Sequence, residues 1–277
     1  MTTDAAAVDL VAHRPMLYGL AYRLLGSAHD ADDVLQEAYL RWLRADREAV
    51  AEPRRYLSRV VTHLALDRLR ARQAEPYVGP WLPEPLVEGD VDPAEHRDSL
   101  SLAMLHLLER LTPPERAVYV LRTAFDLPYQ EIAEILDRTP EDCRQLHHRA
   151  TRHLPASPRF SAALAEQERL LDRFLAAARE GDLPGLKRLL AADATAWSDG
   201  GGRVKAALRP IVGADRVARF FTGIYPAPLR ARPIGLAGET AALVGPCQRL
   251  LALGVAHGRI TDVYLIGNPD KLRKILS

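Results

Sequence analysis

The sequence predicts two all-α domains followed by one α+β domain. Up to about residue 156, apolar residues recur three and four positions apart, the spacing of amphipathic helices. After Pro158 the pattern changes to two helical segments and then to short β-type runs. A proline-rich stretch separates the two helical domains. The predicted boundaries are therefore 1–75, 76–98, 99–156 and 159–277.

Composition narrows the function classes. The chain has 277 residues and a formal net charge of +1, which argues against a protein that coats nucleic acid through its overall field. Any DNA contact must come from local basic patches. The two cysteines, Cys143 and Cys247, give neither a disulfide framework nor a C-x-x-C metal spacing, so we expect no metal or cofactor. Without a signal-peptide pattern or a long apolar run, we expect a cytoplasmic protein.

The first domain opens with an amphipathic helix over residues 8–25, and a second helix follows Gly26-Ser27. Polar and acidic residues crowd the start of this second helix. The helix dipole is one explanation, because each carboxylate near a helix N-terminus stabilises the helix by about 0.3–1 kcal/mol. Their number also fits an exposed surface for a partner. The residues concerned are Asp30, Asp32, Asp33, Gln36 and Glu37.

A third helix, residues 53–73, is strongly basic, with six arginines against the single acid Asp67. Such a charge run is often only a solvated face. The aromatic rings among the arginines, however, are the combination expected where single-stranded bases are held. The candidate nucleic-acid-binding residues are Arg54, Arg55, Tyr56, Arg59, His63, Arg68 and Arg70.

The stretch after this helix, residues 76–93, contains five prolines and cannot form a helix. It also contains Tyr77, Trp81, Leu82 and Leu86, which are too apolar for a freely solvated tether. We therefore expect this linker to dock along a surface.

The second domain contains the motif around which the chain is organised. Thr112-Pro113-Pro114-Glu115 is a capping box that opens one helix. Residues 129–154 then read as two helices joined by a three-residue turn, with Thr139 as the N-cap of the second. Cys143, Leu146 and Ala150 should face inward.

The opposite face of that last helix carries positive charge and bidentate donors, as phosphate contact and major-groove base reading require. A short-turn helix pair also occurs as an ordinary solvated hairpin in all-α domains. The candidate DNA-contacting residues are Arg144, Gln145, His148, Arg149 and Arg152.

The last domain begins with helical segments at residues 160–179 and 182–191. The expected strands are Ala194–Ser198, Arg230–Leu236, Thr240–Val244, Leu250–Ala256 and Ile260–Ile266. Helices before a run of strands predict a compact α+β domain with a curved antiparallel sheet. The loop Asp199–Arg203 suits a tight connection that needs positive φ, and it lacks the Lys-Ser/Thr of a P-loop.

The order of these segments resembles the extracytoplasmic-function (ECF) sigma factors of bacterial RNA polymerase. DADDVLQEAYLRWL, LALDRLRA, LTPPERAVYVLR and LPYQEIAEIL are similar to motifs of sigma regions 2 and 4. YVGPWLPEP, DGGGR and NPDKL resemble the subgroup with a C-terminal SnoaL-like domain, an NTF2-like cone. The expected fold is thus sigma region 2, a linker, sigma region 4 with its helix-turn-helix, and a SnoaL-like domain.

The resemblance implies a transcription initiation factor that works with core RNA polymerase, bound at the β′ clamp helices and the β flap. The acidic second helix would face polymerase, with Asp33, Gln36 and Glu37 at matching positions. The basic third helix would hold the −10 element of promoter DNA, and the last helix of region 4 would read the −35 element. His63 departs from the usual Asn, and His147 and His148 replace small or apolar residues. Together with His153 of the same helix, His147 and His148 predict DNA affinity that falls as pH rises through the histidine range.

For the C-terminal domain the resemblance implies regulation in cis, with room for an unidentified small ligand. The residues expected at this regulatory contact are Trp81, Leu82, Pro83, Asp199, Gly200, Gly201, Gly202, Arg203, Asn268, Pro269 and Asp270. One alternative is a helix-turn-helix regulator with a ligand sensor. Another is a SnoaL-type isomerase or cyclase.

An enzyme would need an acid or base in an apolar pocket. The available groups are Asp199 on the glycine loop, Asp215 at a helix start, His257 in a turn and Asp262. Because the first three positions are typical of a surface, we expect a protein that is not an enzyme.

Overall fold

The structure is a computed structural model that describes residues 2–87, 101–154, 164–224, 230–236 and 239–276. Residues 88–98 of the predicted linker and 160–163 of a predicted helix lie outside these ranges. The described chain forms two compact units. Residues up to 76 and from 107 to 154 make the N-terminal unit, and residues 77–87, 101–106 and 164–276 make the C-terminal unit.

This grouping differs from the predicted boundaries in one respect. The start of the linker and the start of the second helical domain both belong to the C-terminal unit. The reason is apolar burial: Leu82, Leu86 and Leu102 are all buried, and Leu82 and Leu102 share one cluster with residues of the sheet.

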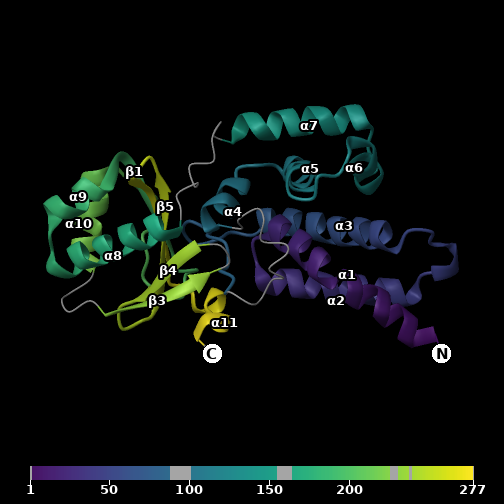
Figure 1. The fold of residues 1–277 in the computed structure, drawn as a ribbon, viewed down its shortest axis with the longest axis horizontal. Coiled ribbons are helices and arrows are strands. Elements are labelled where there is room, and N and C mark those ends of the chain that lie inside the picture. The colour runs from purple at the N-terminus through teal and green to yellow at the C-terminus, as the bar shows by residue number, and fades with distance from the viewer. Residues whose placement is uncertain (1, 88–100, 155–163, 225–229, 237–238, 277) are drawn as a thin grey trace. The chain divides into compact units, whose positions relative to one another are not determined.

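The N-terminal unit begins with three helices, α1 (Thr2–Leu25), α2 (Ala28–Arg44) and α3 (Pro53–Ala74) (Figure 1). They pack on one another through apolar stripes that include Leu17, Leu35, Trp42 and Leu57. Ser27 caps α2 by accepting from the Asp30 backbone N–H at 3.1 Å, which explains why the helix starts where the sequence predicts it. A short 3-10 turn, η1 (Arg47–Ala49), precedes α3.

The second helical region consists of α4 (Leu102–Leu108), α5 (Pro113–Thr123), α6 (Tyr129–Leu136) and α7 (Pro140–His153). The capping box of α5 is present, and α6 and α7 are separated by three residues, as predicted. Asp137 ends α6 in the left-handed conformation with φ of 52°. The hydroxyl of Thr139 then accepts from the Asp142 N–H at 3.1 Å and starts α7. The predicted inner residues Cys143, Leu146 and Ala150 are buried.

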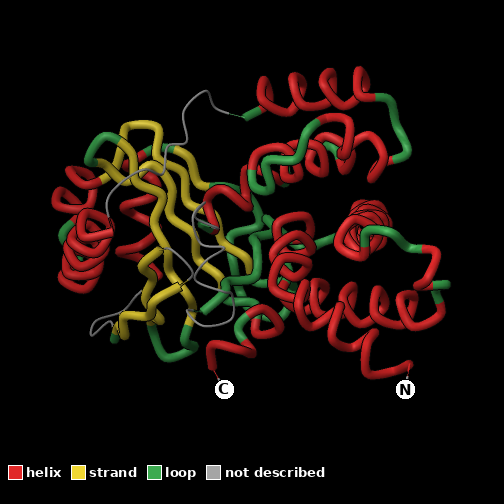
Figure 2. Tube along the Cα trace, turned by 45° about the vertical axis from the view of Figure 1, so that its right-hand side comes forward, coloured by secondary structure: helices red, strands yellow, loops and turns green. Residues whose placement is uncertain are grey.

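The C-terminal unit combines helices with a six-stranded sheet. Its helices are α8 (Leu164–Glu180), α9 (Leu183–Leu189), α10 (Ala214–Ile224), the 3-10 turn η3 (Pro269–Lys271) and α11 (Arg273–Leu276). Its strands are β1 (Leu190–Asp199), β2 (Ile211–Val212), β3 (Ala231–Leu236), β4 (Glu239–Val244), β5 (Arg249–Ala256) and β6 (Arg259–Ile266). The strand order is β2-β1-β6-β5-β4-β3. Figure 2 shows the strands in yellow and the helices in red.

The expectation of a purely antiparallel sheet was wrong, because β1 and β6 pair in parallel. Strands β3 to β6 form an antiparallel meander through short turns. The parallel pair arises because β1 is joined to β6 by about sixty residues that include β2, α10 and the meander. Segment lengths and turn residues predicted five of the strands, but β1 begins earlier than expected and β2 was not predicted. They also do not specify which two strands meet after so long a connection.

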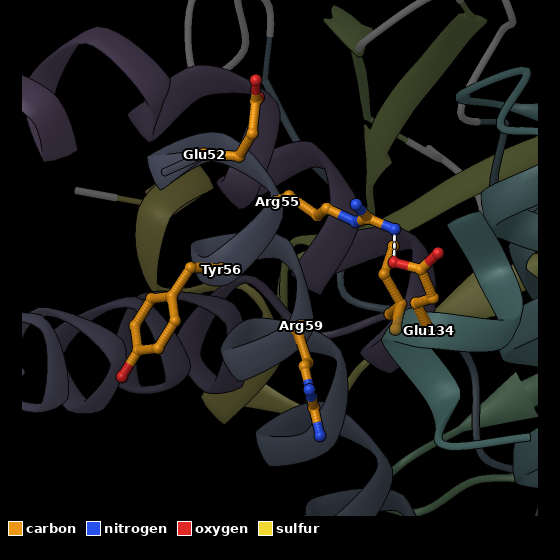
Figure 3. A pocket seen from close by; sticks show the side chains of 6 residues that line it. Glu52, Arg55, Tyr56, Arg59 and Glu134 are labelled. Atoms are coloured by element: carbon orange, nitrogen blue, oxygen red, sulfur yellow. Dashed lines mark ion pairs between the residues drawn. The ribbon is translucent and has the colours of Figure 1, made fainter. Parts of the chain in front are cut away.

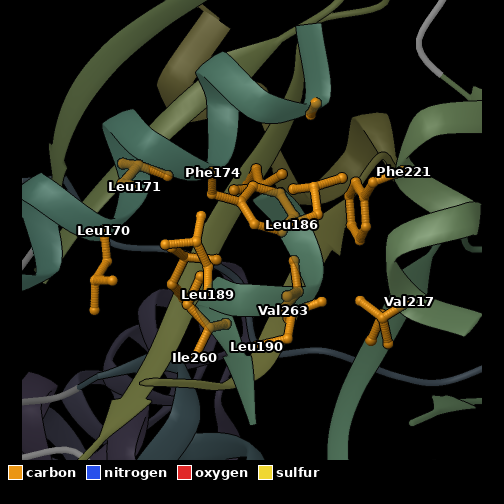
Figure 4. Packing of buried hydrophobic residues seen from close by; sticks show 14 of the residues in the cluster. Leu170, Leu171, Phe174, Leu186, Leu189, Leu190, Val217, Phe221, Ile260 and Val263 are labelled. Carbon is orange, nitrogen blue, oxygen red and sulfur yellow. The ribbon is translucent and has the colours of Figure 1, made fainter. Parts of the chain in front are cut away.

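Alternate residues of the strands build two apolar clusters on opposite faces of the sheet. On one face, Phe174, Leu186 and Phe221 from α8, α9 and α10 pack against strand residues such as Val263 (Figure 4). These rings and branched chains form the core between the helices and this face of the sheet.

The other face is covered by segments from both ends of the unit. Leu82 of the linker, Leu102 and Ala103 of α4, and Leu272 and Ile275 near the C-terminus pack there. The predicted docking of the linker is therefore confirmed for its described part. Within the ranges given above, no helix has the length and apolar character needed to cross a lipid bilayer.

Candidate nucleic-acid interfaces and the strap site

The predicted DNA-contacting residues of α7 lie together on one exposed face. We call this set, Arg144, Gln145, His148, Arg149 and Arg152, the recognition face. Four of the five line a shallow, open depression of about 410 Å³ together with Glu141. The face is basic and accessible, and its donors point away from the buried Cys143, Leu146 and Ala150.

Tyr129, the first residue of α6, supports this face from the side. The guanidinium of Arg144 lies 5.7 Å from the Tyr129 ring centroid, and that of Arg122 lies 5.4 Å from it. The Tyr129 hydroxyl is 2.9 Å from Nδ1 of His147. His147 is thus half-buried among aromatic rings, and burial together with Arg122 lowers its pKa. Of the two adjacent histidines, only His148 belongs to the recognition face.

Arg149 is held by an acid from another helix. Its Nε donates to Oε1 of Glu115 at 3.1 Å. Glu115 is the capping-box residue of α5, and its Oε2 accepts from the Thr112 N–H at 3.1 Å and from the Thr112 hydroxyl at 2.7 Å. One carboxylate therefore caps α5 and contacts the recognition face of α7.

The predicted single-strand-binding residues of α3 are in a different situation. We call this set, Arg54, Arg55, Tyr56, Arg59, His63, Arg68 and Arg70, the basic face. The C-terminal end of α6 packs on its centre. Arg55 forms an ion pair with Glu134, and Nη2 of Arg59 lies 2.6 Å from Oδ1 of Asp137. His63 Nε2 is 2.8 Å from the Ile135 carbonyl oxygen and 3.4 Å from the Asp137 carboxylate.

A hollow of about 260 Å³ remains beside this contact, lined by Glu52, Arg55, Tyr56, Arg59, Glu134 and Ile135. Figure 3 shows Arg55 reaching across to Glu134. Tyr56 instead packs its ring against Trp42, with the two centroids 5.4 Å apart. The stacking surface expected of Tyr56 is therefore partly used within the helical core.

The remaining members of the basic face differ in their exposure and in their ion-pair partners. Arg54 is exposed, and Arg70 pairs with Asp67 one turn earlier at 2.8 Å. Arg68 lies 3.1 Å from Asp30 and 3.3 Å from Asp33, so it joins α3 to α2. These ion pairs link the basic face, predicted to bind DNA, to the acidic residues of α2, predicted to bind polymerase.

A buried ionic cluster lies farther along α3 and was not predicted. Arg72 and Arg116 both bind Glu109, and Arg72 donates to the Leu25 carbonyl at 2.7 Å. Arg116 is 2% exposed and also donates to the Arg23 carbonyl at 3.2 Å. Burial would raise the pKa of Glu109, but the two guanidinium groups lower it. Charge and hydrogen bonding thus join α1 and α3 to the second helical region.

The acidic residues of α2 are partly neutralised. Asp30 and Asp33 contact Arg68, and Asp32 lies 3.4 Å from Arg14. Gln36 and Glu37 are exposed, with Glu37 paired to Arg41 at 3.1 Å. Leu40, one turn beyond them, is 46% exposed. The accessible part of this surface is therefore less acidic and more apolar than the sequence suggested.

In the C-terminal unit the linker residues 77–87, here called the strap, bind to a buried carboxylate. Asp199 is 0% exposed, so the expectation of a surface acid was wrong. Its Oδ1 accepts from the Tyr77 hydroxyl at 2.6 Å, and its Oδ2 accepts from the Leu82 N–H at 2.9 Å. Burial, and then Asp199 itself, raise the pKa of Tyr77, so this hydroxyl stays protonated.

Residues near the C-terminus complete the strap site. Lys271 Nζ lies 2.7 Å from Asp199 Oδ2, contacts the Leu82 carbonyl and lies 4.1 Å from the Trp81 ring centroid. Asn268 Nδ2 donates to the Tyr77 hydroxyl at 3.1 Å. The motifs YVGPWLPEP, DGGGR and NPDKL therefore meet at one place, although about 190 residues separate the first from the last.

The glycine loop fits this site for steric reasons. Gly201 has φ of 56°, and a Cβ there would come within 2.2 Å of the Asn268 side chain. Gly202 has φ of 71° and faces Val78 of the strap. Positive φ was predicted for this loop, and the close approach of Asn268 gives a second reason for glycine. Arg203 and Asp270 form an exposed ion pair at 3.5 Å, and Pro269 is exposed in η3.

The groups considered for acid–base chemistry are dispersed. Asp215 lies on the surface of α10, where hydrogen bonds from Arg219 and Lys187 lower its pKa to about 2. His257 is exposed in the β5–β6 turn with φ of 51°. Asp262 accepts from the Trp197 indole at 3.3 Å. Asp199 is occupied by the strap.

Tyr77, Lys271, Glu109 and Glu115 were not among the predicted site residues. Tyr77 and Lys271 lie inside motifs that were recognised, so their position was a usable signal. Glu115 was assigned only to its capping box. Nothing in the sequence marks Glu109, because its two arginine partners become neighbours only in the fold.

Known sequence families match the two helical regions. Sigma-70 region 2 matches residues 10–75, and Sigma-70, region 4 matches residues 101–154. The ECF RNA polymerase sigma factor SigJ of Mycobacterium tuberculosis (strain ATCC 25618 / H37Rv) is 36% identical, over 95% of this chain and 92% of SigJ. The probable ECF RNA polymerase sigma factor SigI of the same species (strain CDC 1551 / Oshkosh) is 34% identical, over 97% and 95%. A crystal structure of M. tuberculosis SigJ has a TM-score of 0.77 at 32% identity, covering 96% of this chain and 98% of that one.

These likenesses include the C-terminal unit as well as the helical regions. Two helical regions, the second with a helix-turn-helix, define a transcription factor of the Sigma-70 class. The chain belongs to the ECF RNA polymerase sigma factors. The predicted fold class and sigma-factor function are confirmed at this level, and a free-standing ligand-sensing regulator is not favoured.

Proposed function

We propose that this sigma factor binds core RNA polymerase through α2, reads the −35 element with α7 and reads the −10 element with α3. The observation that carries the proposal is the contrast between the two basic surfaces. The recognition face is open, whereas α6 covers the centre of the basic face. The described structure is therefore suited to duplex reading at −35 but not to holding a melted −10 strand.

Promoter opening thus requires α6 to leave α3. The covering contacts described above are two partly exposed ion pairs and the contacts of His63 with the Ile135 carbonyl and the Asp137 carboxylate. Exposed ion pairs contribute only about 0.2–1 kcal/mol each. Polymerase and promoter binding can supply enough free energy to replace them, because the freed arginines gain phosphate contacts.

For the polymerase surface we propose Gln36, Glu37 and Leu40, with Asp30, Asp32 and Asp33 holding the helix in place. An exposed leucine beside polar residues suits a protein partner such as the β′ clamp helices. Glu37→Lys should prevent holoenzyme assembly and leave the circular dichroism spectrum unchanged, because Glu37 is exposed and pairs with Arg41 on its own helix. Normal co-purification of this variant with core polymerase would contradict the assignment.

The C-terminal unit acts in cis through the strap. The strap follows α3 directly, and residues 101–106 precede the rest of the second helical region. Because the C-terminal unit binds both segments, it limits how much of the connection between the two DNA-reading regions is free. Asp199→Asn keeps the size of the side chain but weakens the bonds to Tyr77 and Lys271.

The effect of Asp199→Asn can be measured on promoters that differ in the spacing between the −10 and −35 elements. Run-off transcription with purified core polymerase should tolerate a wider range of −10/−35 spacings for Asp199→Asn than for the native chain. The matched control is Asp215→Asn, a surface acid of the same unit. Identical spacing profiles for native chain and Asp199→Asn would argue against control by the strap.

We further propose that the C-terminal unit is not an enzyme. Asp215 lies on the surface, His257 in a turn and Asp199 in the strap site, while Asp262 accepts from the Trp197 indole, and apolar side chains cover the helix side of the sheet. The first experiment is run-off transcription by the full chain with core polymerase. No initiation at any tested promoter of a genomic library would overturn the proposed function as a whole.

A further inference from the structure

Glu115 has two roles, of which the sequence indicated only the capping of α5. It is 5% exposed, and its Oε2 is fixed by both hydrogen bonds from Thr112 at the start of α5. Its Oε1 receives the Nε–H of Arg149 at 3.1 Å. Arg149 remains half-exposed, with a side-chain exposure of 54%. His153 Nδ1 also lies 3.8 Å from Oε2.

The geometry of the guanidinium explains how the contact between Glu115 and Arg149 can affect base reading. Arginine reads guanine with two parallel donors, which bond O6 and N7 in the major groove. When a carboxylate binds Nε, the two terminal nitrogens still offer such a pair, and the plane of the fork is fixed by the carboxylate. Side-chain rotation is lost before DNA arrives, so less entropy is lost on binding.

We propose that Glu115 is a positioning residue for the −35 element: it orients Arg149 so that the terminal nitrogens of the guanidinium read one guanine. This deepens the proposed function and rests on it. Glu115 itself does not touch DNA. The acid lies on α5, so the base preference of α7 depends on a residue outside the recognition helix.

The test replaces the carboxylate and keeps the cap. Glu115→Gln can still accept from Thr112 through its amide oxygen, because glutamine also serves in capping boxes. Its amide nitrogen would then face Arg149 and cannot accept the Nε–H. Holoenzyme made with the full chain is offered promoters in which every −35 position is varied, and initiation is scored by sequencing.

Glu115→Gln should reduce the preference for guanine at one −35 position by about fivefold, with the other positions unchanged. Arg149→Ala should remove the preference at that same position, and the double variant should resemble Arg149→Ala alone. Asp215→Asn, which removes a surface carboxylate of the C-terminal unit, is the control for the change in charge and should leave base preference unaltered.

Three outcomes would overturn the inference. They are an unchanged profile for Glu115→Gln, an equal loss at all −35 positions, and additive effects of the two substitutions. If Arg149→Ala changes no −35 preference, the −35 assignment of this residue fails together with the inference. Should Glu115→Gln not fold, nuclear magnetic resonance of the native chain provides the test. The Arg149 Nε–H must be protected from exchange, with and without −35 duplex, and rapid exchange in both would contradict the proposal.

Discussion

The basic face of α3 and the recognition face of α7 have similar compositions but opposite environments. Both are rich in arginine, and each contains one of the histidines that depart from the family pattern. The acids near the recognition face, Glu115 and Glu141, each hold an arginine in place and leave the face open. The acids near the basic face, Glu134 and Asp137, come from another region and cover it.

The comparison shows that local charge alone does not tell whether a basic surface is available. An acid from a rigid neighbour within the same region orients an arginine. An acid at the end of α6, the helix that we propose moves away from α3, occupies an arginine. For a sigma factor the second arrangement is useful, since the melted −10 strand is available only after duplex recognition has begun.

The largest expected effect comes from breaking the buried ionic cluster around Glu109. Glu109→Ala leaves Arg72 and Arg116 without their shared acid, and Arg116 is almost completely buried. Breaking a buried ion pair from one side typically costs about 3–5 kcal/mol. We expect a loss of this size in the free energy of unfolding measured with urea, and easier separation of α3 from α6.

The matched control for that prediction is Glu141→Ala, which breaks an exposed pair with Arg144. It should cost less than about 1 kcal/mol. Equal losses for the two variants would show that the cluster around Glu109 does not support the packing.

The next effect concerns the open surface. Arg149→Ala should weaken discrimination among −35 sequences by about 1–3 kcal/mol, because a bidentate base contact is lost. Competition binding of holoenzyme to duplexes with altered −35 elements measures this directly. The −10 preference should not change, and a change there of equal size would contradict the separation of the two surfaces.

A smaller effect is expected from uncovering the basic face. The double substitution Glu134→Gln and Asp137→Asn removes the partners of Arg55 and Arg59. Affinity for a single-stranded −10 oligonucleotide, measured by fluorescence anisotropy at fixed salt, should rise by about two- to thirtyfold, because two exposed pairs at roughly 0.2–1 kcal/mol each are removed.

Removing two negative charges also attracts DNA nonspecifically, so the control must match in net charge. Glu141→Gln with Asp142→Asn changes the charge equally near the open face. If this control raises single-strand affinity as much as the first variant, the rise does not come from uncovering α3.

The smallest expected effect is the pH dependence of −35 binding. A protonated histidine attracts phosphate, so affinity should fall as pH rises through the range where exposed histidines lose their proton. His148 and His153 are exposed on α7. Because burial lowers the pKa of His147, that ring carries less charge than an ordinary histidine at the same pH, and His147→Phe should change the profile least. Equal affinity at pH 6 and pH 8 for the native chain would remove the prediction.

Much of the fold could be predicted because its signals are local. Helical periodicity, the capping box at Thr112 and the N-cap at Thr139 determine where α5 and α7 begin, and glycine turns separate the strands. The open recognition face followed from the same periodicity, since the inner residues of α7 define its outer side. Motif order was enough to indicate the family.

Pairings between distant residues were not predictable in the same way. The parallel contact of β1 with β6, the burial of Asp199 and the meeting of Glu109 with two arginines each depend on chain segments far apart in sequence. An isolated acid has no sequence signature that distinguishes a surface carboxylate from a buried one.

The sequence by itself determined which helices carry positive charge, where they start and which side of each is apolar. Only the tertiary structure decided which positive surface is free, because that depends on where the C-terminal end of α6 packs. Periodicity fixes the direction of a side chain relative to its own helix, whereas its availability to DNA depends on the neighbours that the fold brings to it.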